Sequence, residues 1–420
     1  MALQRCGPCH IGCLAGTPLS GWCDARDPQQ GMWAPRTSVV IYVPATASPE
    51  LRIAAVGDGS DEPSSRRAWR PKRVLVTRSA FERPHGQAIV ERCAAAGVPD
   101  IQLLKADRLP PLRGGDERST YALAKSTLAV VVAPESKRRP QPIPPSADWR
   151  FDLAEGCPAH CQYCYLAGSL GGPPITRAYA NVDEILAGLD EYVGRGRVTS
   201  GTAQRGAEGT TFEASCYTDP LGIEPITGSL SAAVQHFGRH DWPGPVQLRL
   251  TTKFDDVSPL LGLDHGGRTR VRLSVNAAPV ARRFEGGTAS VPARLTALRR
   301  LALAGYPVGL TIAPIMPVDD WRIHYGQLLQ DVAAAVSDVP DLDLTTELIT
   351  HRFTPASKQV LLGWYPRTQL EMDEELRRQK RGKYGAVKHV YPAPVMSELR
   401  TWFEREIAAV LPGARVLYWT

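Results

Sequence analysis

Hydrophobic and polar residues follow a regular alternation along residues 146–355. Six short runs, rich in β-branched and apolar residues, have the pattern of strands. They are "WRFDLAEG" (149–156), "TTFEASCY" (210–217), "VQLRLTTKF" (246–254), "RVRLSVNA" (270–277), "VGLTIAPIM" (308–316) and "LDLTTELIT" (342–350). Because helical patterns separate these strands, we predict an α/β fold built on a partial (β/α)6 TIM-type barrel, two strands short of the full eight.

Two of the intervening segments show the helical pattern well. In residues 181–194, Asn181 can cap the first turn of a helix. Glu184, three residues later, can complete a capping box by bonding back to the start of the helix. In residues 293–306, Leu295, Leu298 and Ala302 fall on one stripe, as in a helix with one buried face. We therefore predict a helix over each segment.

Shorter units flank the predicted barrel. Residues 71–140 contain two strand patterns (72–79 and 101–106) around a helical one (86–97), which predicts a small N-terminal α/β unit. A proline-rich linker, "KRRPQPIPP", follows at 137–145. Residues 356–420 form a C-terminal extension with a hairpin segment at 383–392, a helix at 395–411 and a last strand at 414–419.

Residues 1–70 have a different composition. They are rich in Gly, Pro, Ser, Arg and Trp and lack sustained periodicity, apart from a possible strand at 38–45, so we predict a disordered extension. Its cysteines Cys6, Cys9, Cys13 and Cys23 could form a second metal site. We favour instead a dispensable extension, or a start site assigned too early, with Met32 or a later residue as the true beginning.

Composition narrows the class of protein. No run reaches the roughly 18–20 apolar residues of a membrane span, and the first residues lack the apolar core of a signal peptide, so we expect a cytoplasmic protein that meets no membrane. Net charge is +6, of which residues 1–73 contribute three, with nine basic against six acidic residues. Charge therefore argues only weakly for nucleic acid. The nine cysteines are too clustered for a disulfide framework, which favours metal or catalytic use.

Three cysteines stand close together in "GCPAHCQYCYLAG" (156–168), directly after the first barrel strand. Cys157, Cys161 and Cys164 could ligate three irons of a [4Fe–4S] cluster and leave the fourth iron open to a ligand from outside the protein. The alternative is a structural zinc with His160 as its fourth ligand. Zinc sites usually join two well separated ligand pairs, so the spacing favours the cluster.

This CxxxCxxC motif on the first strand of a partial barrel resembles the radical S-adenosylmethionine superfamily. Seven segments in order, "GCPAHCQYCYL", "FEASCYTDPLG", "TKF", "RLSVNA", "IAPI", "LITHRFT" and "KYGAVKHVYP", are similar to the spore photoproduct lyase family from about residue 72 to the C-terminus. The resemblance implies two cofactors, the [4Fe–4S] cluster and S-adenosylmethionine (AdoMet). It further implies a carbon–carbon lyase that returns the ultraviolet product 5-thyminyl-5,6-dihydrothymine in DNA to two thymines.

Cys216 ends the second predicted strand and should face the same mouth as the cysteine loop. A lone cysteine is often a buried core residue. In the family, however, the cysteine of "FEASC" donates hydrogen to the product thymine radical. Tyr163 and Tyr165 bracket Cys164, and the resemblance implies that they relay the resulting thiyl radical back so that AdoMet is regenerated; simple aromatic packing is the alternative.

Polar groups at other strand ends should meet at the same mouth. By resemblance, Thr218, Lys253 and Ser274 fall at AdoMet-contact positions, with Ala313 near the adenine. The family usually has a serine at the position of Thr218, and threonine keeps the hydroxyl group. Asn276 is placed like these residues, and for any one of them a solvated strand end is the alternative.

Substrate contacts are expected later in the chain. Residues 351–354 ("HRFT") and the run "RGKYGAVKH", with Lys383, Tyr384, Lys388 and His389, combine positive charge with an aromatic ring, which suits phosphate contact and base stacking, although a solvated basic turn looks the same. In the family this segment is a hairpin that meets the lesion, usually with an arginine where Lys383 stands. An ammonium lacks the bidentate fork of a guanidinium.

The resemblance also implies partners: ultraviolet-damaged DNA and an electron donor such as flavodoxin or ferredoxin, with the protein itself a monomer. Two other functions remain open at this point. One is a radical AdoMet enzyme of the same fold with a different substrate, because a barrel mouth is easily respecified. The other is a noncatalytic metalloprotein that binds nucleic acid.

Overall fold

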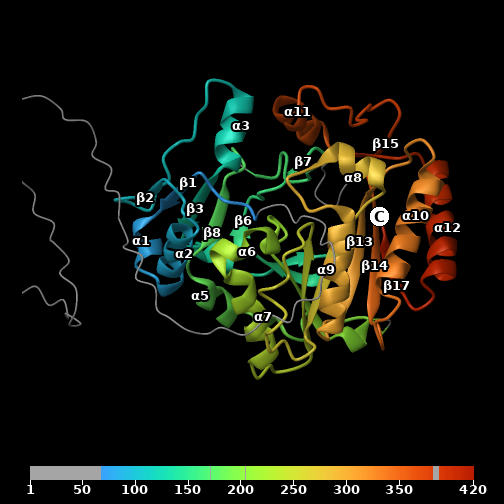
Figure 1. Cartoon of the computed structure of the whole chain (residues 1–420), viewed down its shortest axis with the longest axis horizontal. Helices are drawn as coiled ribbons and strands as arrows, with labels where there is room; N and C mark the ends of the chain where they lie inside the picture. The colour runs from blue at the N-terminus through green and yellow to red at the C-terminus, as the bar shows by residue number, and fades with distance from the viewer. Residues whose placement is uncertain (1–67, 171, 204, 382–386) are drawn as a thin grey trace, which may run out of the picture. The chain divides into compact units, whose positions relative to one another are not determined.

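The computed structural model describes residues 68–170, 172–203, 205–381 and 387–420 (Figure 1). Several predictions fall outside these ranges. They are the disordered extension with its possible strand at 38–45, the possible metal site at Cys6, Cys9, Cys13 and Cys23, and the substrate residues Lys383 and Tyr384.

The centre of the fold is a curled eight-stranded sheet in the order β17-β14-β13-β11-β10-β9-β5-β4. Six neighbouring parallel strands coincide with the six predicted ones, so the partial (β/α)6 barrel is confirmed. Their bounds are β5 (Ala147–Phe151), β9 (Thr210–Ala214), β10 (Val246–Thr252), β11 (Thr269–Val275), β13 (Val308–Ile315) and β14 (Leu344–Thr350). The sheet adds β4 (Gln141–Ile143), antiparallel to β5, and β17 (Arg415–Trp419), parallel to β14.

The barrel strands carry apolar side chains on the face that helices cover and polar ones on the inner face. In β11, for example, Val271, Leu273 and Val275 belong to the hydrophobic core, whereas Arg272 and Ser274 belong to the opposite face. The other barrel strands repeat the alternation. The inside of this barrel is therefore polar, in contrast to the apolar layers that fill a complete TIM barrel.

Helices cover the outer face of the sheet, and α9, α10 and α12 stand side by side along it (Figure 1). The predicted helix at 293–306 is confirmed, with Leu295 and Leu298 buried. The helices are α1 (Arg78–Phe81), α2 (Pro84–Ala95), α3 (Glu117–Lys125), α4 (Glu135–Arg138), α5 (Val182–Ala187), α6 (Pro220–Thr227), α7 (Ser229–Arg239), α8 (Ala278–Phe284), α9 (Val291–Leu303), α10 (Trp321–Ala335), α11 (Pro355–Trp364) and α12 (Ala393–Val410), with short 3-10 turns at Asp190–Tyr192 and Gly206–Glu208.

The predicted helix at 181–194 is shorter than expected, because α5 ends at Ala187, before Gly188. The predicted cap at Asn181 was wrong. Its side-chain oxygen accepts a hydrogen bond from the backbone N–H of Ala133 at 2.8 Å, and its amide donates to the Glu184 carboxylate at 3.1 Å. Asn181 thus links α5 to a distant segment and does not cap the helix.

A second sheet has five strands in the order β2-β1-β3-β8-β6. The first three lie within the predicted N-terminal unit, and the last two come from the segment around the cysteine loop. Their bounds are β1 (Arg73–Val76), β2 (Ile101–Leu103), β3 (Thr127–Val131), β8 (Thr176–Tyr179) and β6 (Ala154–Glu155). The division of the chain into four parts stays a prediction, and this sheet joins residues from two of those parts.

Two short antiparallel pairs complete the strands: β7 (His160–Cys161) with β12 (Glu285–Gly286), and the predicted hairpin, β15 (Arg378–Arg381) with β16 (Val387–Val390). The predicted last strand is confirmed as β17, but it joins the barrel sheet itself. There it covers the edge of β14, which would otherwise offer unpaired backbone groups. No helix in the part of the chain that the structure describes has the length and apolar character that a bilayer crossing requires.

Candidate active site

Groups from three other parts of the chain contact the backbone of the cysteine loop. Gly156 begins it with a φ of +78°, where a Cβ atom would lie 2.2 Å from the carbonyl oxygen of Ile175. Lys125 at the end of α3 is buried, and its Nζ donates to the carbonyl oxygen of Cys157 at 2.6 Å. Cys161 lies in β7 and pairs with Glu285 of β12. These contacts fix the path of the loop without using the cysteine side chains.

The three thiols of this loop lie close enough to affect one another. Burial raises the pKa of Cys157 to about 12, and Cys164 contributes to the shift. Burial also raises the pKa of Cys161, with Cys164 and Cys157 adding to it and Lys253 opposing it. Cys157, Cys161 and Cys164 are free thiols. The loop therefore brings the three predicted ligands together, unpaired and beside a lysine.

These thiols fit an iron–sulfur cluster better than a single ion. Within the described ranges, no three His, Cys, Asp or Glu side chains are grouped as ligands of one metal ion. A zinc ion needs its ligand atoms about 2.0–2.3 Å from one centre, whereas in a [4Fe–4S] cluster each thiolate ligates a different iron. His160, the fourth ligand in the zinc alternative, has its Nδ1 in a hydrogen bond with the Tyr121 hydroxyl at 3.0 Å, so a metal ion could bind only at its Nε2.

Tyr163 is anchored by a buried ionic network that sequence reasoning missed. Its hydroxyl donates to the carboxylate of Glu285, whose other oxygen accepts from Arg294 on α9 at 2.6 Å. Arg294 also donates to the carbonyl oxygen of Ser274 at 2.8 Å. Burial opposes ionisation of Glu285, but Lys253 and Arg294 outweigh it and hold the pKa of that carboxyl below its ordinary value. The network ties the cysteine loop to β11.

The predicted AdoMet residues lie on the inner face or at the ends of neighbouring strands. The Nζ of Lys253 donates to the hydroxyl of Ser274, and the backbone N–H of Lys253 donates to Asp219 at 2.7 Å. Thr218 has a buried hydroxyl without a hydrogen-bond partner among the described residues, although a buried hydroxyl normally has one. Ala313 lies in β13 and is half-buried.

Cys216 follows a strained residue. Ser215, which is buried, has a φ of +56°, a conformation that costs about 1–3 kcal/mol for a non-glycine residue. Its N–H donates to Phe151 at 2.7 Å, and its hydroxyl accepts from the N–H of Leu153 at 2.9 Å. Both partners belong to the segment that leads into the cysteine loop, so these bonds fix Cys216 relative to that loop.

Tyr165 lies near both Cys216 and the cysteine loop, because cysteines of both places contribute to its pKa. The residue is 62% exposed, yet the protein around it displaces part of its hydration, which raises its pKa, and the charges of Cys216, Cys164 and Cys157 raise that pKa further. Burial likewise raises the pKa of Cys216 well above its ordinary value, so its thiol is protonated at neutral pH. A thiol and a phenol that both keep their hydrogen thus stand beside the loop.

Other polar candidates are structural. Asn276 is fully buried, and its side chain accepts from Tyr325 at 2.9 Å and donates to the Pro314 carbonyl at 2.8 Å, so it is not a free group at the mouth. His351 is buried against Arg377, and His389 is buried against Glu374. These two histidines and Asn276 were expected to be available for ligands, but the described contacts use them inside the fold.

The predicted substrate segment keeps a basic surface in its described part. Strand β15 exposes all four of its residues, "RQKR". Burial lowers the pKa of Lys388 on β16, and the positive charges of Arg352 and Lys380 lower it further, so these three cations lie close together. Such a surface suits contact with phosphates.

Inside the barrel, Arg272 of β11 lies between two carboxylates, Glu213 of β9 and Glu347 of β14. Only 1% of its side chain is exposed. Arg272 also donates to the hydroxyl of Ser146 at 2.9 Å, and Tyr418 of β17 donates to Glu347 at 3.1 Å. This network joins strands that are not neighbours in the sheet and forms a polar layer within the barrel.

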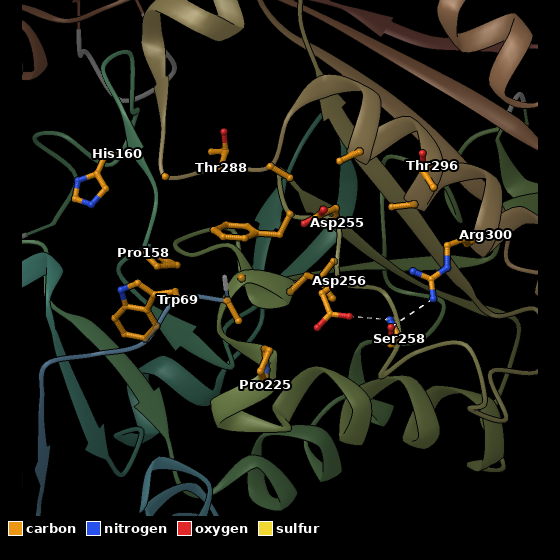
Figure 2. A pocket seen from close by; sticks show the side chains of 18 residues that line it. Trp69, Pro158, His160, Pro225, Asp255, Asp256, Ser258, Thr288, Thr296 and Arg300 are labelled. Carbon is orange, nitrogen blue, oxygen red and sulfur yellow. Dashed lines mark hydrogen bonds between the residues drawn. The ribbon is translucent and has the colours of Figure 1, made fainter. Parts of the chain in front are cut away.

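A hollow lies beside the cysteine loop and not inside the barrel. It has a volume of about 550 Å³ and lies between α6, α9 and the segment after β10, with Pro158 and His160 of the loop in its wall (Figure 2). Arg300 donates to the hydroxyl of Ser258 on its rim at 3.4 Å. Cys216, Thr218, Lys253 and Ser274 do not line it. It is therefore distinct from the polar mouth.

Comparison with known proteins gives consistent results. Residues 69–420 match the family model described as spore photoproduct lyase. The spore photoproduct lyases of Geobacillus sp. (strain Y412MC61) and Bacillus subtilis (strain 168) are 39% and 37% identical over 350 residues, 83% of this chain and 98% of each relative. A solved spore photoproduct lyase mutant with bound AdoMet and dinucleoside spore photoproduct matches with a TM-score of 0.76 and 37% identity, over 84% of this chain and all of that one.

Proposed function

This chain belongs to the spore photoproduct lyase family, and we propose that it repairs the spore photoproduct, 5-thyminyl-5,6-dihydrothymine, in damaged DNA. The relatives carry the name of this activity along nearly their whole length, and one solved relative holds both AdoMet and the dinucleoside lesion. The observation in this chain that carries the proposal is that Cys216 and Tyr165 stand beside a loop with three free thiols.

The polar mouth supplies a place for each cofactor. Cys157, Cys161 and Cys164 would hold a [4Fe–4S] cluster through their thiolates. Thr218, Lys253 and Ser274 would bind AdoMet, with Ala313 beside the adenine. The partnerless hydroxyl of Thr218 supports this assignment, because a bound ligand would satisfy it. When bound, the cluster and AdoMet supply the radical chemistry that removes a hydrogen atom from the lesion.

Cys216 then completes the repair. Its S–H gives a hydrogen atom to the thymine radical left when the bridge breaks, and the sulfur becomes a thiyl radical. The O–H of Tyr165 would restore the thiol, that of Tyr163 would restore Tyr165, and 5′-deoxyadenosine would return a hydrogen atom to Tyr163, so that one hydrogen atom moves at each step and no radical remains on the protein. The raised pKa values of all three groups support this role, because each keeps the hydrogen that it must transfer.

The remaining expectations concern partners. The basic surface of β15 and β16 supports a DNA substrate, with Lys383 and Tyr384, which follow β15 in the sequence, as proposed contacts. Presenting the lesion requires its bases to leave the helix, at a cost of a few kcal/mol that a distorted lesion lowers. An electron donor such as flavodoxin or ferredoxin, a monomeric state and a cytoplasmic location stay predictions.

A label-transfer experiment tests the function. Anaerobically reconstituted protein, with AdoMet, a chemical reductant and a dithymine lesion deuterated at the position that loses hydrogen, should release thymine and produce deuterated 5′-deoxyadenosine. Cleavage of AdoMet without attack on the lesion would indicate a radical enzyme with another substrate. Absence of AdoMet cleavage from protein shown to contain reduced cluster would point to a noncatalytic metalloprotein.

Replacing Cys216 with alanine should leave the early steps of the reaction intact and impair the last one, the formation of thymine. Cluster content, AdoMet cleavage and hydrogen abstraction should persist, because none of these steps uses the thiol. Thymine yield should fall by at least about tenfold, equivalent to about 1.4 kcal/mol in barrier height, while adducts of the trapped radical accumulate. Quantifying thymine, adducts and 5′-deoxyadenosine in one reaction measures all three effects.

Cys93→Ala is the matched control, because Cys93 is a buried free cysteine in the core of the small sheet. It should lower stability modestly and leave the product ratio unchanged. If Cys216→Ala behaves in the same way as Cys93→Ala, Cys216 is a packing residue and not the hydrogen donor.

A further inference from the structure

Asp152 is a buried carboxylate at the mouth of the barrel that the mechanism above does not use. It directly follows β5, whose last residue, Phe151, stacks on Phe237 of α7 on the helix-covered face. Successive side chains of a strand point to opposite faces, so Asp152 belongs to the inner, polar face. Only 4% of the residue is exposed.

One oxygen of this carboxylate has no partner. Oδ2 accepts a hydrogen bond from the guanidinium of Arg150 at 2.9 Å. Oδ1 is buried and accepts no hydrogen bond from any described residue. A buried acceptor without a partner is costly, and native structures leave few of them. A carboxylate held by an arginine on one side and without a partner on the other can accept an N–H or O–H group, once the groups that cover Oδ1 make way for that donor.

The carboxylate that carries this partnerless oxygen lies near the groups of the proposed reaction. The charge of Asp152 raises the pKa of both Cys216 and Tyr165, which places the carboxylate near the hydrogen donor and its relay. The other charged groups around Asp152 are Arg150, Glu155 and Lys137. Burial raises the pKa of Asp152 to about 6, and the carboxylate form still predominates at neutral pH.

We propose that Oδ1 of Asp152 accepts the N3–H of a thymine in the lesion and thereby selects an imide base. This inference rests on the proposed function, because it names a contact to that substrate. Bases that leave the helix are read at their Watson–Crick edge. Thymine has one donor on that edge, N3–H, whereas N3 of cytosine is an acceptor and would be repelled by a carboxylate. Both rings of the lesion keep N3–H, because the bridge is made through C5 and its methyl carbon.

A cycle over protein and substrate tests the contact. Holoprotein of the wild type and of Asp152→Ala is titrated with the dithymine dinucleoside and with its N3-methylated analogue, and dissociation constants are read by tryptophan fluorescence. The wild type should bind the methylated analogue about 10- to 100-fold more weakly, the range for loss of a hydrogen bond to a buried charged group. Asp152→Ala should bind the unmethylated lesion more weakly by a similar factor and should hardly distinguish the two.

The design separates the possible failures. If Asp152→Ala discriminates against N3-methylation as strongly as the wild type, Asp152 is not the acceptor. If AdoMet affinity falls in this variant while lesion affinity does not, the open oxygen serves the cofactor, and the proposal is overturned. A wild-type protein that binds no lesion would overturn the proposed function together with this inference.

A second variant covers a folding defect. Asp152→Asn keeps the shape of the side chain and one carbonyl oxygen, and its melting temperature should stay closer to wild type than that of Asp152→Ala. It should retain part of the discrimination against the methylated analogue. Full loss of discrimination in Asp152→Ala with partial loss in Asp152→Asn supports the contact, whereas unchanged discrimination in both variants rejects it.

Discussion

Replacing Cys161 with alanine is expected to abolish the cluster and all AdoMet cleavage. Cys161 is buried in β7, and no other cysteine among the described residues stands within the loop except Cys157 and Cys164. Two thiolates cannot hold a cluster that needs three. Loss of a supporting residue near a metal already costs about 10- to 100-fold, so loss of a ligand should reduce cleavage by more than about 100-fold. Iron and sulfide content, visible absorbance and 5′-deoxyadenosine formation measure the effect.

His160→Ala is the matched control because His160 neighbours Cys161 in the same strand, β7. It removes the hydrogen bond with Tyr121 but no proposed ligand, so iron content should remain near that of the wild type. Loss of the metal in His160→Ala, with zinc in place of iron in the wild type, would support the alternative Cys3His site. Full AdoMet cleavage by Cys161→Ala would reject the cluster assignment.

Replacing Arg272 with methionine should cause the largest loss of stability, by about 3–5 kcal/mol. The guanidinium lies between Glu213 and Glu347, and methionine would leave both carboxylates buried without their cation. Burial raises the pKa of Glu213 even with Arg272 present. Urea unfolding of the cluster-free protein, followed by circular dichroism, measures the change in the free energy of unfolding.

The loss should depend on pH in a defined direction. A carboxyl whose pKa is higher in the folded state binds protons more tightly there than in the unfolded chain, so protonation stabilises the fold. The destabilisation in Arg272→Met should therefore shrink as pH falls through the raised pKa of Glu213 and grow as pH rises. Arg299→Met, which breaks an exposed pair with Asp338, should cost less than about 1 kcal/mol. Equal losses in the two variants would show that the inner network contributes no more than a surface pair.

Local pattern was sufficient to predict the elements and the order of the six barrel strands, because alternating strands and helices favour parallel neighbours. It could not predict pairings that depend on distant segments. Strand β17 was assigned to a separate extension, yet it pairs with β14, and β8 and β6 pair within the small sheet. The Asn181 cap failed for the same reason, since its oxygen is used by Ala133, 48 residues away in sequence.

The site divides in a similar way. The spacing of three cysteines indicates a metal centre by itself, and Cys216 stands out because it follows a strand. Charged residues such as Arg272, Glu285 and Asp152 give no such local signal, because a charged strand residue usually faces water. The opposite charges of β9, β11 and β14 are one clue, but it can be interpreted only when the strand order places Arg272 and Glu347 on either side of β13.

Strands β6 and β8 belong to the same sheet as β1, β2 and β3. This shared sheet limits where two related chains could be joined to make a functional chimaera. The cysteine loop leaves from β6, and the chain re-enters the same sheet at β8, while Lys125 of α3 holds the loop from the N-terminal side. In a chimaera joined at the proline-rich linker, β3 and β8 would come from different proteins. The residue at position 125 and the cysteine loop would also come from different proteins. The shortest segment that could be exchanged without disturbing the loop therefore includes both sheets. The family match, over residues 69–420, also includes both. Chimaeras joined at the linker would have to match β3 and β8 in register before they could place the three thiols.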